Sequence, residues 1–298
     1  MELAFNPWLA FGWSIFAGFL MAMGAGGGGI LAGIGHISIL GIGDPNVIKA
    51  VNQMLELTSR LFSVPLYLRQ KRLIWSLAIA FGVGAPLGAI SGSWASKTYL
   101  SDMGDYQMLF GLLVLLVAAR TIFEALSPPA KRSPRLQRAF DISERVQSER
   151  ARDPDAESAR PRLRGLSPLR IRLRIGGDDV EFNPLAAAAG GFAISFVGAT
   201  LGVGGGFLVT PFMASLLLFP MFFVVGTALV ALMVPLAASV LTYIYLNVDI
   251  DWLLVAIEAP GIAIGSILGP TINRRINERF LRLFVASVLV CIGVYYLV

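Results

Sequence analysis

The distribution of charge along the chain constrains its fold more than any other sequence feature. Residues 127–181 hold 13 of the 24 Lys and Arg residues and 9 of the 19 Asp and Glu residues of this 298-residue chain. Overall only 14% of the residues are charged and 56% are hydrophobic, whereas about a quarter of the residues of an ordinary soluble domain are charged. The regions on either side of 127–181 therefore predict a membrane protein.

Apolar segments recur through both of these regions, and their lengths indicate how they use the membrane. They lie at 8–25, 30–43, 47–68, 73–95, 106–126, 184–201, 207–219, 221–246, 252–272 and 280–298. A helix of about 20 residues spans a bilayer, but the segments 30–43 and 207–219 are shorter, and each follows a cluster of glycines. We therefore predict an all-α polytopic membrane protein with about five membrane segments in each half and short half-helices after the glycine-rich breaks.

The two halves are related by an internal repeat at a constant shift of 177 positions. The shift places Phe5-Asn6-Pro7 on Phe182-Asn183-Pro184 and Trp75 on Trp252. It also superposes glycines at matching positions, namely Gly27, Gly28, Gly29, Gly84, Gly88 and Gly92 on Gly204, Gly205, Gly206, Gly261, Gly265 and Gly269. Chance does not place so many Gly and Trp matches in one register, so the chain is a tandem repeat.

Loop charges predict that the two repeats have opposite orientations. The loop at 69–72 is basic, while its counterpart in the second half carries Asp249 and Asp251. Conversely, the loop at 97–105 carries two aspartates, and its counterpart at 274–282 is rich in arginine. Basic loops mark the cytoplasmic side. We therefore expect an inverted-topology repeat in the cell inner membrane, with the central loop in the cytoplasm and both termini outside.

The sequence divides into three parts on this interpretation. Residues 1–126 form a first transmembrane repeat, 127–181 a cytoplasmic charged linker, and 182–298 a second transmembrane repeat. This segment contains six prolines and many charges, which predicts that most of it is a linker or a small peripheral element, with a solvated tether favoured. Within it, alternating residues at 169–175 and 180–182 around Gly176-Gly177 are typical of a β-hairpin, and a regulatory or partner-binding role stays open.

The glycine clusters at 27–29 and 204–206 are the motifs closest to chemistry. The first formally matches a dinucleotide-binding fingerprint, but the strand-turn-helix context that this fingerprint requires is missing. Glycines permit unwound backbone, which is tolerated in a membrane only where it is buried in protein or lines a cavity. The helix that restarts after each break has unpaired N–H groups, so two breaks brought together would bind an anion. Tight helix crossing is the alternative interpretation.

These clusters resemble a known family. The stretch Gly202-Val-Gly-Gly-Gly-Phe-Leu-Val-Thr-Pro211, preceded by Gly191-Phe-Ala-Ile-Ser-Phe-Val-Gly198, is similar to the signature of the sulfite exporter TauE/SafE family, also called the sulfonate uptake permease family. The first half matches the glycines but has Ile34 where the repeat predicts proline. The resemblance covers both membrane halves and implies a transporter of sulfite, organosulfonates or related small anions that works by alternating access.

The third segment carries the strongest side-chain candidates, Lys49, Asn52, Gln53, Glu56 and Arg60. A rise of 1.5 Å per residue places Glu56 about 15 Å into the membrane, where a charge costs roughly 2.5–3.5 kcal/mol. Arg60 at i+4 is its expected partner. We predict that Asn52 and Gln53 bind substrate and that Glu56 and Arg60 are coupling or charge-pair residues, with a purely structural salt bridge as the alternative. On the functional interpretation Arg60 or Lys49 attracts the anion and Glu56 takes up a proton. On the alternative interpretation Lys49 extends toward the surface.

Three more polar residues are candidates outside this segment. Thr227 becomes the counterpart of Asn52 when the two halves are aligned with a slightly smaller shift. Its hydroxyl is therefore a further substrate-binding candidate. Glu258 lies on the outer half of its segment, and His36 follows the first glycine cluster; both are candidate coupling or charge-pair residues. With one histidine and one cysteine in the chain, we expect neither a metal site nor a cofactor.

The function predicted from these features is secondary transport of small sulfur-containing oxyanions, such as sulfite, sulfoacetate or taurine-like sulfonates. Transport would proceed by alternating access, with proton coupling left open. An anion channel, a carrier for small carboxylates and, less favoured, a membrane assembly or binding subunit are the alternatives. An enzyme is not expected, because no nucleophile–base pair is evident. The expected partners are a small anion and the lipid bilayer, with a homo-oligomer left open and no nucleic acid.

Overall fold

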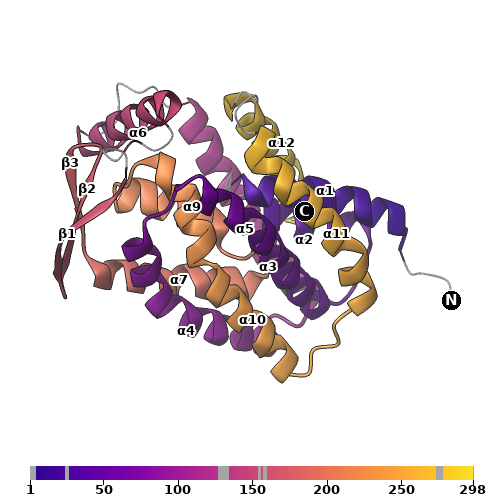
Figure 1. The fold of residues 1–298 in the computed structure, drawn as a ribbon. Coiled ribbons are helices and arrows are strands. Elements are labelled where there is room, and N and C mark those ends of the chain that lie inside the picture. Colours follow the sequence, from indigo (N-terminus) through magenta and orange to yellow (C-terminus); the bar gives the residue numbers. More distant parts are fainter. Residues whose placement is uncertain are drawn as a thin grey trace.

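The computed structural model describes residues 5–23, 27–126, 134–153, 156, 160–272 and 278–297. They form a helical bundle with a small sheet at one end, and α1 begins at the opposite end (Figure 1). The elements before the sheet are α1 (Pro7–Ala22), α2 (Gly28–Ile34), the π-helical turn η1 (Gly35–Ile39), α3 (Pro45–Arg69), α4 (Trp75–Tyr99), α5 (Met103–Leu126) and α6 (Pro134–Arg152). The sheet consists of β1 (Arg162–Ser167), β2 (Arg170–Ile175) and β3 (Asp178–Phe182). The remaining elements are α7 (Pro184–Leu201), α8 (Gly206–Pro211), the π-helical turn η4 (Phe212–Leu216), α9 (Met221–Ala231), α10 (Met233–Tyr245), α11 (Trp252–Ile272) and α12 (Glu278–Tyr295).

Five stretches of helix among the described residues are long and apolar enough to cross a membrane. They are Trp75–Tyr99, Met103–Phe123, Pro184–Leu201, Met221–Tyr245 and Trp252–Thr271. This confirms the predicted all-α membrane architecture at the level of fold class. The helix α3 has 25 residues but carries Lys49, Glu56 and Arg60, which lower its hydropathy. The arginines of the loop at 274–275 lie outside the described residues.

Local sequence explains where the first helix of each half begins. Asn6 and Asn183 are N-caps, and the side-chain oxygen of each accepts hydrogen bonds from two backbone N–H groups of the first turn. A proline follows each cap at the first helical position, where its missing N–H has no consequence. The same Phe-Asn-Pro signature therefore precedes and starts α1 and α7.

Backbone details after the glycine breaks recur at the same shift that relates the two halves in sequence. The turn η1 is matched residue for residue by η4. In the first half the N–H groups of Leu40 and Ile42 donate to the carbonyl oxygens of Gly35 and His36, respectively. In the second half the corresponding N–H groups of Leu217 and Phe219 donate to the carbonyl oxygens of Phe212 and Met213. Gly41 and Leu218, which also correspond, both have positive φ, of 67° and 59°. The short segments thus fold alike in the two halves.

Glycines also mediate the packing between the halves, in a reciprocal pattern. Side chains added to Gly84, Gly88 and Gly92 of α4 would meet the carbonyls of Ala188, Phe192 and Phe196 of α7. Side chains added to Gly261, Gly265 and Gly269 of α11 would meet the carbonyls of Phe11, Ile15 and Phe19 of α1. The shift of 177 positions relates the three glycines of α4 to those of α11, and the three carbonyl residues of α1 to those of α7. The glycines therefore let α4 approach α7, and α11 approach α1, to backbone contact.

The long helix α3 lies near the middle of the bundle (Figure 1) and packs against both α9 and α10. The hydroxyl of Tyr67 on α3 donates to the carbonyl of Ala22, and that of Tyr243 on α10 donates to the carbonyl of Ala199, both at 3.0 Å. Ala22 and Ala199 lie in the last turn of the first helix of their halves, next to the glycine breaks. These two tyrosines hold the breaks against α3 and α10.

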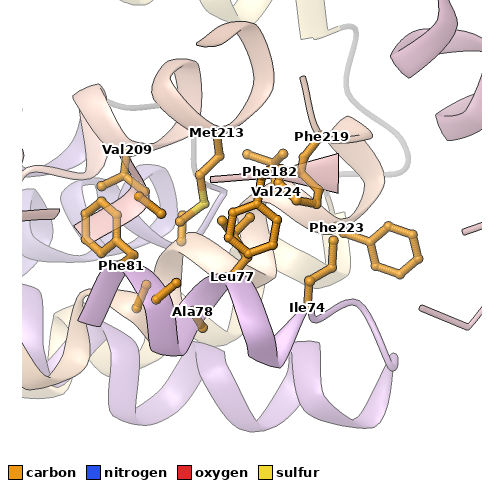
Figure 2. Close-up of a cluster of buried hydrophobic side chains, with 14 of the residues drawn as sticks. Ile74, Leu77, Ala78, Phe81, Phe182, Val209, Met213, Phe219, Phe223 and Val224 are labelled. Atoms are coloured by element: carbon orange, nitrogen blue, oxygen red, sulfur yellow. The ribbon is translucent and has the colours of Figure 1, made fainter. Parts of the chain in front are cut away.

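The described part of the charged segment is folded against the bundle. Strands β2 and β3 pair antiparallel around Gly176-Gly177, and β1 adds a third strand that the sequence pattern did not predict. The inner face of β2 and the helix α6 join a buried apolar cluster with the start of α4, α8, η4 and α9. Figure 2 shows the part of this cluster around Leu77, Met213 and Phe219. Ser143 of α6 also accepts a hydrogen bond from the N–H of Phe222, at 3.0 Å. This part of the segment is a packed cap and not a free tether.

Candidate functional site

The two glycine-rich breaks meet in the interior of the bundle. A side chain added to Gly29 would lie 2.7 Å from the carbonyl oxygen of Val203 in the other break. Gly204 and Gly205 have φ of 66° and 72°, a conformation that residues other than glycine rarely adopt. The breaks predicted from the sequence are therefore adjacent, and both α2 and α8 begin at this point.

The carboxylate of Glu56 lies between the two breaks. A methyl group added to Gly29 would overlap its Oε1, and one added to Gly204 would lie 2.8 Å from its Oε2. A β-carbon is disfavoured at Gly29 by the carbonyl oxygen of Val203, at 2.7 Å, and at Gly204 by the positive φ of 66°, and at both positions the carboxylate would have to move. The glycines therefore bring backbone from both halves into contact with one buried acid.

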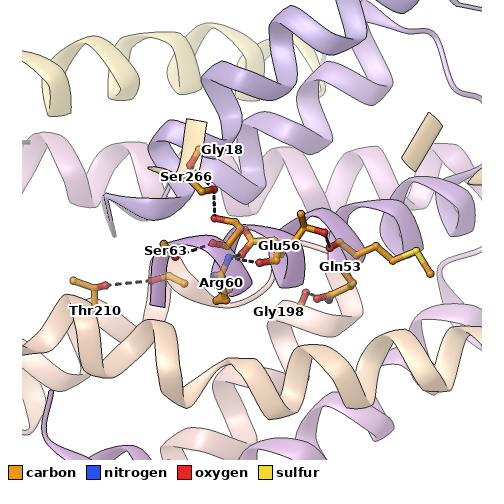
Figure 3. Close-up of polar contacts among 12 residues, drawn as sticks. Gly18, Gln53, Glu56, Arg60, Ser63, Gly198, Thr210 and Ser266 are labelled. Carbon is orange, nitrogen blue, oxygen red and sulfur yellow. Dashed lines mark hydrogen bonds and ion pairs between the residues drawn. The ribbon is translucent and has the colours of Figure 1, made fainter. Parts of the chain in front are cut away.

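Arg60 pairs with Glu56, as the i,i+4 spacing predicts. Its Nη1 contacts Oε2 of Glu56 and also donates to the carbonyl oxygen of Glu56, at 3.0 Å. Both side chains are at most 3% exposed. Figure 3 shows the pair beside Ser63, Ser266 and Thr210. A side chain added to Gly206, the first residue of α8, would lie 3.3 Å from Nη2 of Arg60, so the guanidinium faces the start of that helix.

Glu56 and Arg60 line a small cavity of about 20 Å³. A cavity needs roughly 10–15 Å³ to hold one water molecule, so this one admits water but not a sulfite ion. Its other lining residues are glycine, apolar or threonine: Met21, Gly28, Gly29, Val203, Gly206, Phe207, Thr210, Val225, Ala228, Leu229 and Leu232. The charged pair thus lines a cavity that is large enough for water and too small for a sulfite ion.

Asn52 and Gln53 lie one turn away from Glu56, on two different sides of α3. Neither polar atom of the Asn52 amide has a hydrogen-bond partner, although the side chain is fully buried. Its Nδ2 faces Gly33 of α2. Gln53 donates to the carbonyl of Gly198 at 3.2 Å and lines a second, smaller cavity of about 10 Å³ with Gly204. An unpaired buried amide costs about 1–3 kcal/mol, so Asn52 retains unused capacity to bind a polar ligand.

The remaining predicted glycines and Thr227 lie farther from the charged pair. Gly27 and Gly205 are the N-caps of α2 and α8 and do not line the cavity. The hydroxyl of Thr227 donates to the carbonyl of Phe223 and accepts from the N–H of Ile74, at 2.7 and 3.0 Å. Thr227 therefore uses its hydrogen bonds at the start of α4, and the structure does not bring it to Glu56.

His36 and Glu258 form a second buried pair that sequence spacing gave no reason to expect. Nε2 of His36 on η1 lies 2.7 Å from Oε2 of Glu258 on α11, and both side chains are 1% exposed. The counterparts of these residues in the other half are Met213 and Phe81, which belong to one apolar cluster (Figure 2). The pair therefore breaks the symmetry between the halves.

Lys49 is the residue whose position differs most from the expectation. It is fully buried instead of reaching the surface. Its Nζ donates to the carbonyl of Leu100 at 2.6 Å and lies 5.1 Å from the centre of the Tyr106 ring. Carbonyls at the end of a helix have no partner within it and attract a cation, which explains the position of Lys49 at the end of α4. No cluster of three or more potential metal ligands occurs among the described residues.

Comparison with known proteins gives results that cover nearly the whole chain. The model of a family described as "Sulfite exporter TauE/SafE" matches residues 10–296. The chain is 22% identical over 249 residues to the "Probable membrane transporter protein YunE" of Bacillus subtilis (strain 168), covering 84% of this chain and 80% of that protein. No solved structure matches the chain.

Proposed function

Because the chain belongs to the sulfite exporter TauE/SafE family and is a multi-pass membrane transporter, not an enzyme, we propose that it carries small sulfur-containing oxyanions. Sulfite and organosulfonates such as sulfoacetate or taurine-like compounds are the proposed substrates. The observation that carries this proposal is the guanidinium of Arg60, buried in a cavity where two glycine-rich breaks meet. Sulfite and sulfonate oxygens accept charge-assisted hydrogen bonds from a guanidinium.

Helix geometry supports an anion site at the same place. The first N–H groups of a helix have no partner within it and carry partial positive charge. Both α2 and α8 begin at the breaks beside Arg60. Asn52 and Gln53 are the proposed side-chain donors, together with the backbone at Gly28, Gly29 and Gly206. Thr227 remains a weaker candidate because its hydroxyl already has two partners.

Alternating access is the proposed mechanism, by two repeats of inverted topology. The cavity of about 20 Å³ is too small for the substrate, so loading requires the helices around it to move. The reciprocal contacts of α4 with α7 and of α11 with α1 support two related halves that rock about the central site. We place the protein in the inner membrane, with the cap of α6 and the sheet in the cytoplasm and the termini outside, as the loop charges favour.

Uptake by the purified protein in liposomes tests the proposed function. We expect saturable uptake of labelled sulfite and of a short sulfonate, each competing with the other, and stimulation by an inward proton gradient. Faster transport of acetate than of either would favour a carboxylate carrier, and currents that never saturate would favour a channel. Saturable transport of none of these anions would overturn the proposal.

Arg60→Gln, with Arg69→Gln as its matched control, tests the site. Both residues lie on α3, but Arg69 is exposed at its end. A hydrogen bond to a charged group contributes about 1.5–3 kcal/mol, so we expect Arg60→Gln to reduce the apparent affinity for sulfite by about 10- to 100-fold. Arg69→Gln should retain the wild-type affinity. Equal affinities in the two variants would remove Arg60 from the binding site.

A further inference from the structure

We propose that the carboxylate of Glu56 is a tethered anion that holds the place of the substrate, and that one proton taken up by Glu56 releases Arg60 to bind the substrate. This inference rests on the proposed function, because it takes the cavity at Arg60 as the substrate site. Among the coupling candidates it assigns the proton to Glu56, and it gives the order in which the proton and the anion bind. Proton uptake comes first or together with the anion, and never after the anion alone.

The position of the carboxylate is the first step of the argument. Glu56 contacts Gly29 in one break and Gly204 in the other, so its negative charge lies at the starting points of both α2 and α8. Backbone from both halves therefore surrounds one buried carboxylate. A substrate anion that approached the guanidinium of Arg60 would meet a carboxylate already paired with it.

Arg60 is the one cation among the described residues that line the cavity around Glu56. The described residues that line the cavity lie on α1, α2, α3, α8 and α9. Val203, in the break before α8, and Leu232, between α9 and α10, complete the lining. Among all these lining residues only Glu56 and Arg60 can carry charge. A substrate and an ionised Glu56 therefore compete for one guanidinium. Two anions and one cation in a water-poor cavity would leave an uncompensated buried charge, which is strongly unfavourable.

Protonation of Glu56 removes this conflict and balances the charge. With Glu56 ionised, the site without substrate contains one negative and one positive group and is neutral. With a monovalent anion bound to Arg60 and a proton on Glu56, the loaded site is also neutral. Neither state moves a net charge through the membrane interior, where charge is costly. The proton enters from the aqueous phase that the cavity faces and leaves with the anion on the other side.

Proton uptake on binding tests this inference with the wild-type protein. Methanesulfonate is a suitable probe because it stays ionised at all relevant pH values, so any pH dependence belongs to the protein. Saturating methanesulfonate added to the weakly buffered protein should withdraw up to one proton per molecule, which a pH indicator dye detects. The apparent affinity should rise as the pH falls, by up to about tenfold per pH unit while Glu56 titrates.

Glu56→Gln and Glu258→Gln identify the group that binds the proton. The amide of Glu56→Gln mimics the protonated acid, so this variant should bind methanesulfonate at least as well as the wild type, without proton uptake or pH dependence. Glu258→Gln should retain both, because Glu258 pairs with His36 outside the cavity. A folded Glu56→Gln variant that does not bind methanesulfonate, or that still takes up a proton, would overturn the inference. If this variant does not fold, proton uptake by the wild type decides.

The outcomes separate this inference from the proposed function. Saturable binding of methanesulfonate that is independent of pH and releases or absorbs no proton would contradict the role of Glu56 but leave the anion carrier intact. Absence of saturable binding at every pH, for both methanesulfonate and sulfite, would contradict the proposed function itself. Loss of proton uptake in Glu258→Gln and its retention in Glu56→Gln would assign the proton to the other pair.

Discussion

Gly29 and Gly204 are the single residues on which the geometry of the site depends most directly. Each lies against the Glu56 carboxylate, and Gly204 also has a positive φ of 66°. A β-carbon at either position would force the carboxylate away from the breaks. The position of the Glu56 carboxylate therefore depends on two glycines, one from each half.

Alanine substitutions test this dependence on space. We expect Gly29→Ala and Gly204→Ala to abolish or strongly reduce anion transport, because the new methyl group displaces Glu56. Gly82→Ala is the matched control, since nothing lies within 4 Å of a β-carbon there. Uptake in liposomes and thermal stability in detergent should be measured together. Wild-type transport by both Gly29→Ala and Gly204→Ala would show that the site tolerates displacement of the carboxylate.

Some of the site could be predicted from the sequence, and the reason differs by residue. Glu56 and Arg60 are neighbours by helical spacing, so local geometry sufficed. His36 and Glu258 are 222 positions apart, and their contact depends on which helices of the two halves lie together. The alignment of the repeats predicts Thr227 as a site residue, but its hydrogen bonds depend on Ile74 before another helix. Burial of Lys49 depends likewise on the end of α4.

At the scale of elements, the pair of His36 and Glu258 fastens the turn η1 to α11. Removing one partner of a buried hydrogen-bonded pair leaves the other partner unsatisfied at a cost of about 1–3 kcal/mol, whereas replacing both by apolar groups of similar shape is often nearly neutral. We therefore expect His36→Met to lower the thermal stability of the protein. His36→Met combined with Glu258→Phe places the counterpart residues of the other half at both positions, and we expect this double variant to recover much of the lost stability. Thermal unfolding in detergent measures both. Equal stability of the single variant and the wild type would show that the pair does not support the fold.

The cap formed by α6 and the sheet is held in part by Asp178. Hydrogen bonds from Arg138, at 2.8 Å, and from Arg145 reach its carboxylate. The Arg138 hydrogen bond, followed by that of Arg145, lowers the pKa of Asp178 below its ordinary value of 3.8. A carboxyl with a lowered pKa stabilises the folded state above its ordinary value, and this contribution disappears as the pH falls through the lowered pKa.

Asp178→Asn should therefore loosen the cap at neutral pH and make no difference in strong acid. Asp179→Asn is the control, because the side chain of Asp179 is exposed and lies on the opposite face of the same strand. Limited proteolysis of the reconstituted protein at neutral pH measures the loosening, and we expect faster cleavage near α6 in Asp178→Asn alone. Equal cleavage rates in the two variants would show that the ion pairs do not hold α6.

At the scale of the whole molecule, the two halves meet along seams that each carry a hydrogen bond between serines. Ser93 of α4 lies 2.7 Å from Ser239 of α10, and Ser266 of α11 lies 2.8 Å from Ser59 of α3, measured between their hydroxyl oxygens. The sequence repeat and the inverted loop charges predict two related halves. They do not predict that α4 contacts α7 or that α11 contacts α1, because sequence periodicity contains no information on neighbours in space.

A cross-link across one seam tests whether these helices move during transport. Ser93→Cys with Ser239→Cys, made in a Cys291→Ser background because Cys291 is exposed, should form a disulfide on oxidation. We expect the oxidised protein to lose transport and a reducing agent to restore it, while Ser93→Cys alone should be insensitive to oxidant. Full transport by the oxidised double variant would exclude movement between α4 and α10.

The most direct test of the central claim compares sulfite uptake by the wild type with that by Glu56→Gln combined with Arg60→Gln. The double substitution removes both buried charges at once, so no unpaired charge is left to unfold the protein. We predict saturable uptake by the wild type and uptake at the level of empty liposomes by the folded double variant. Saturable uptake of sulfite by the double variant, at the wild-type rate and affinity, would contradict the assignment of this pair as the substrate site.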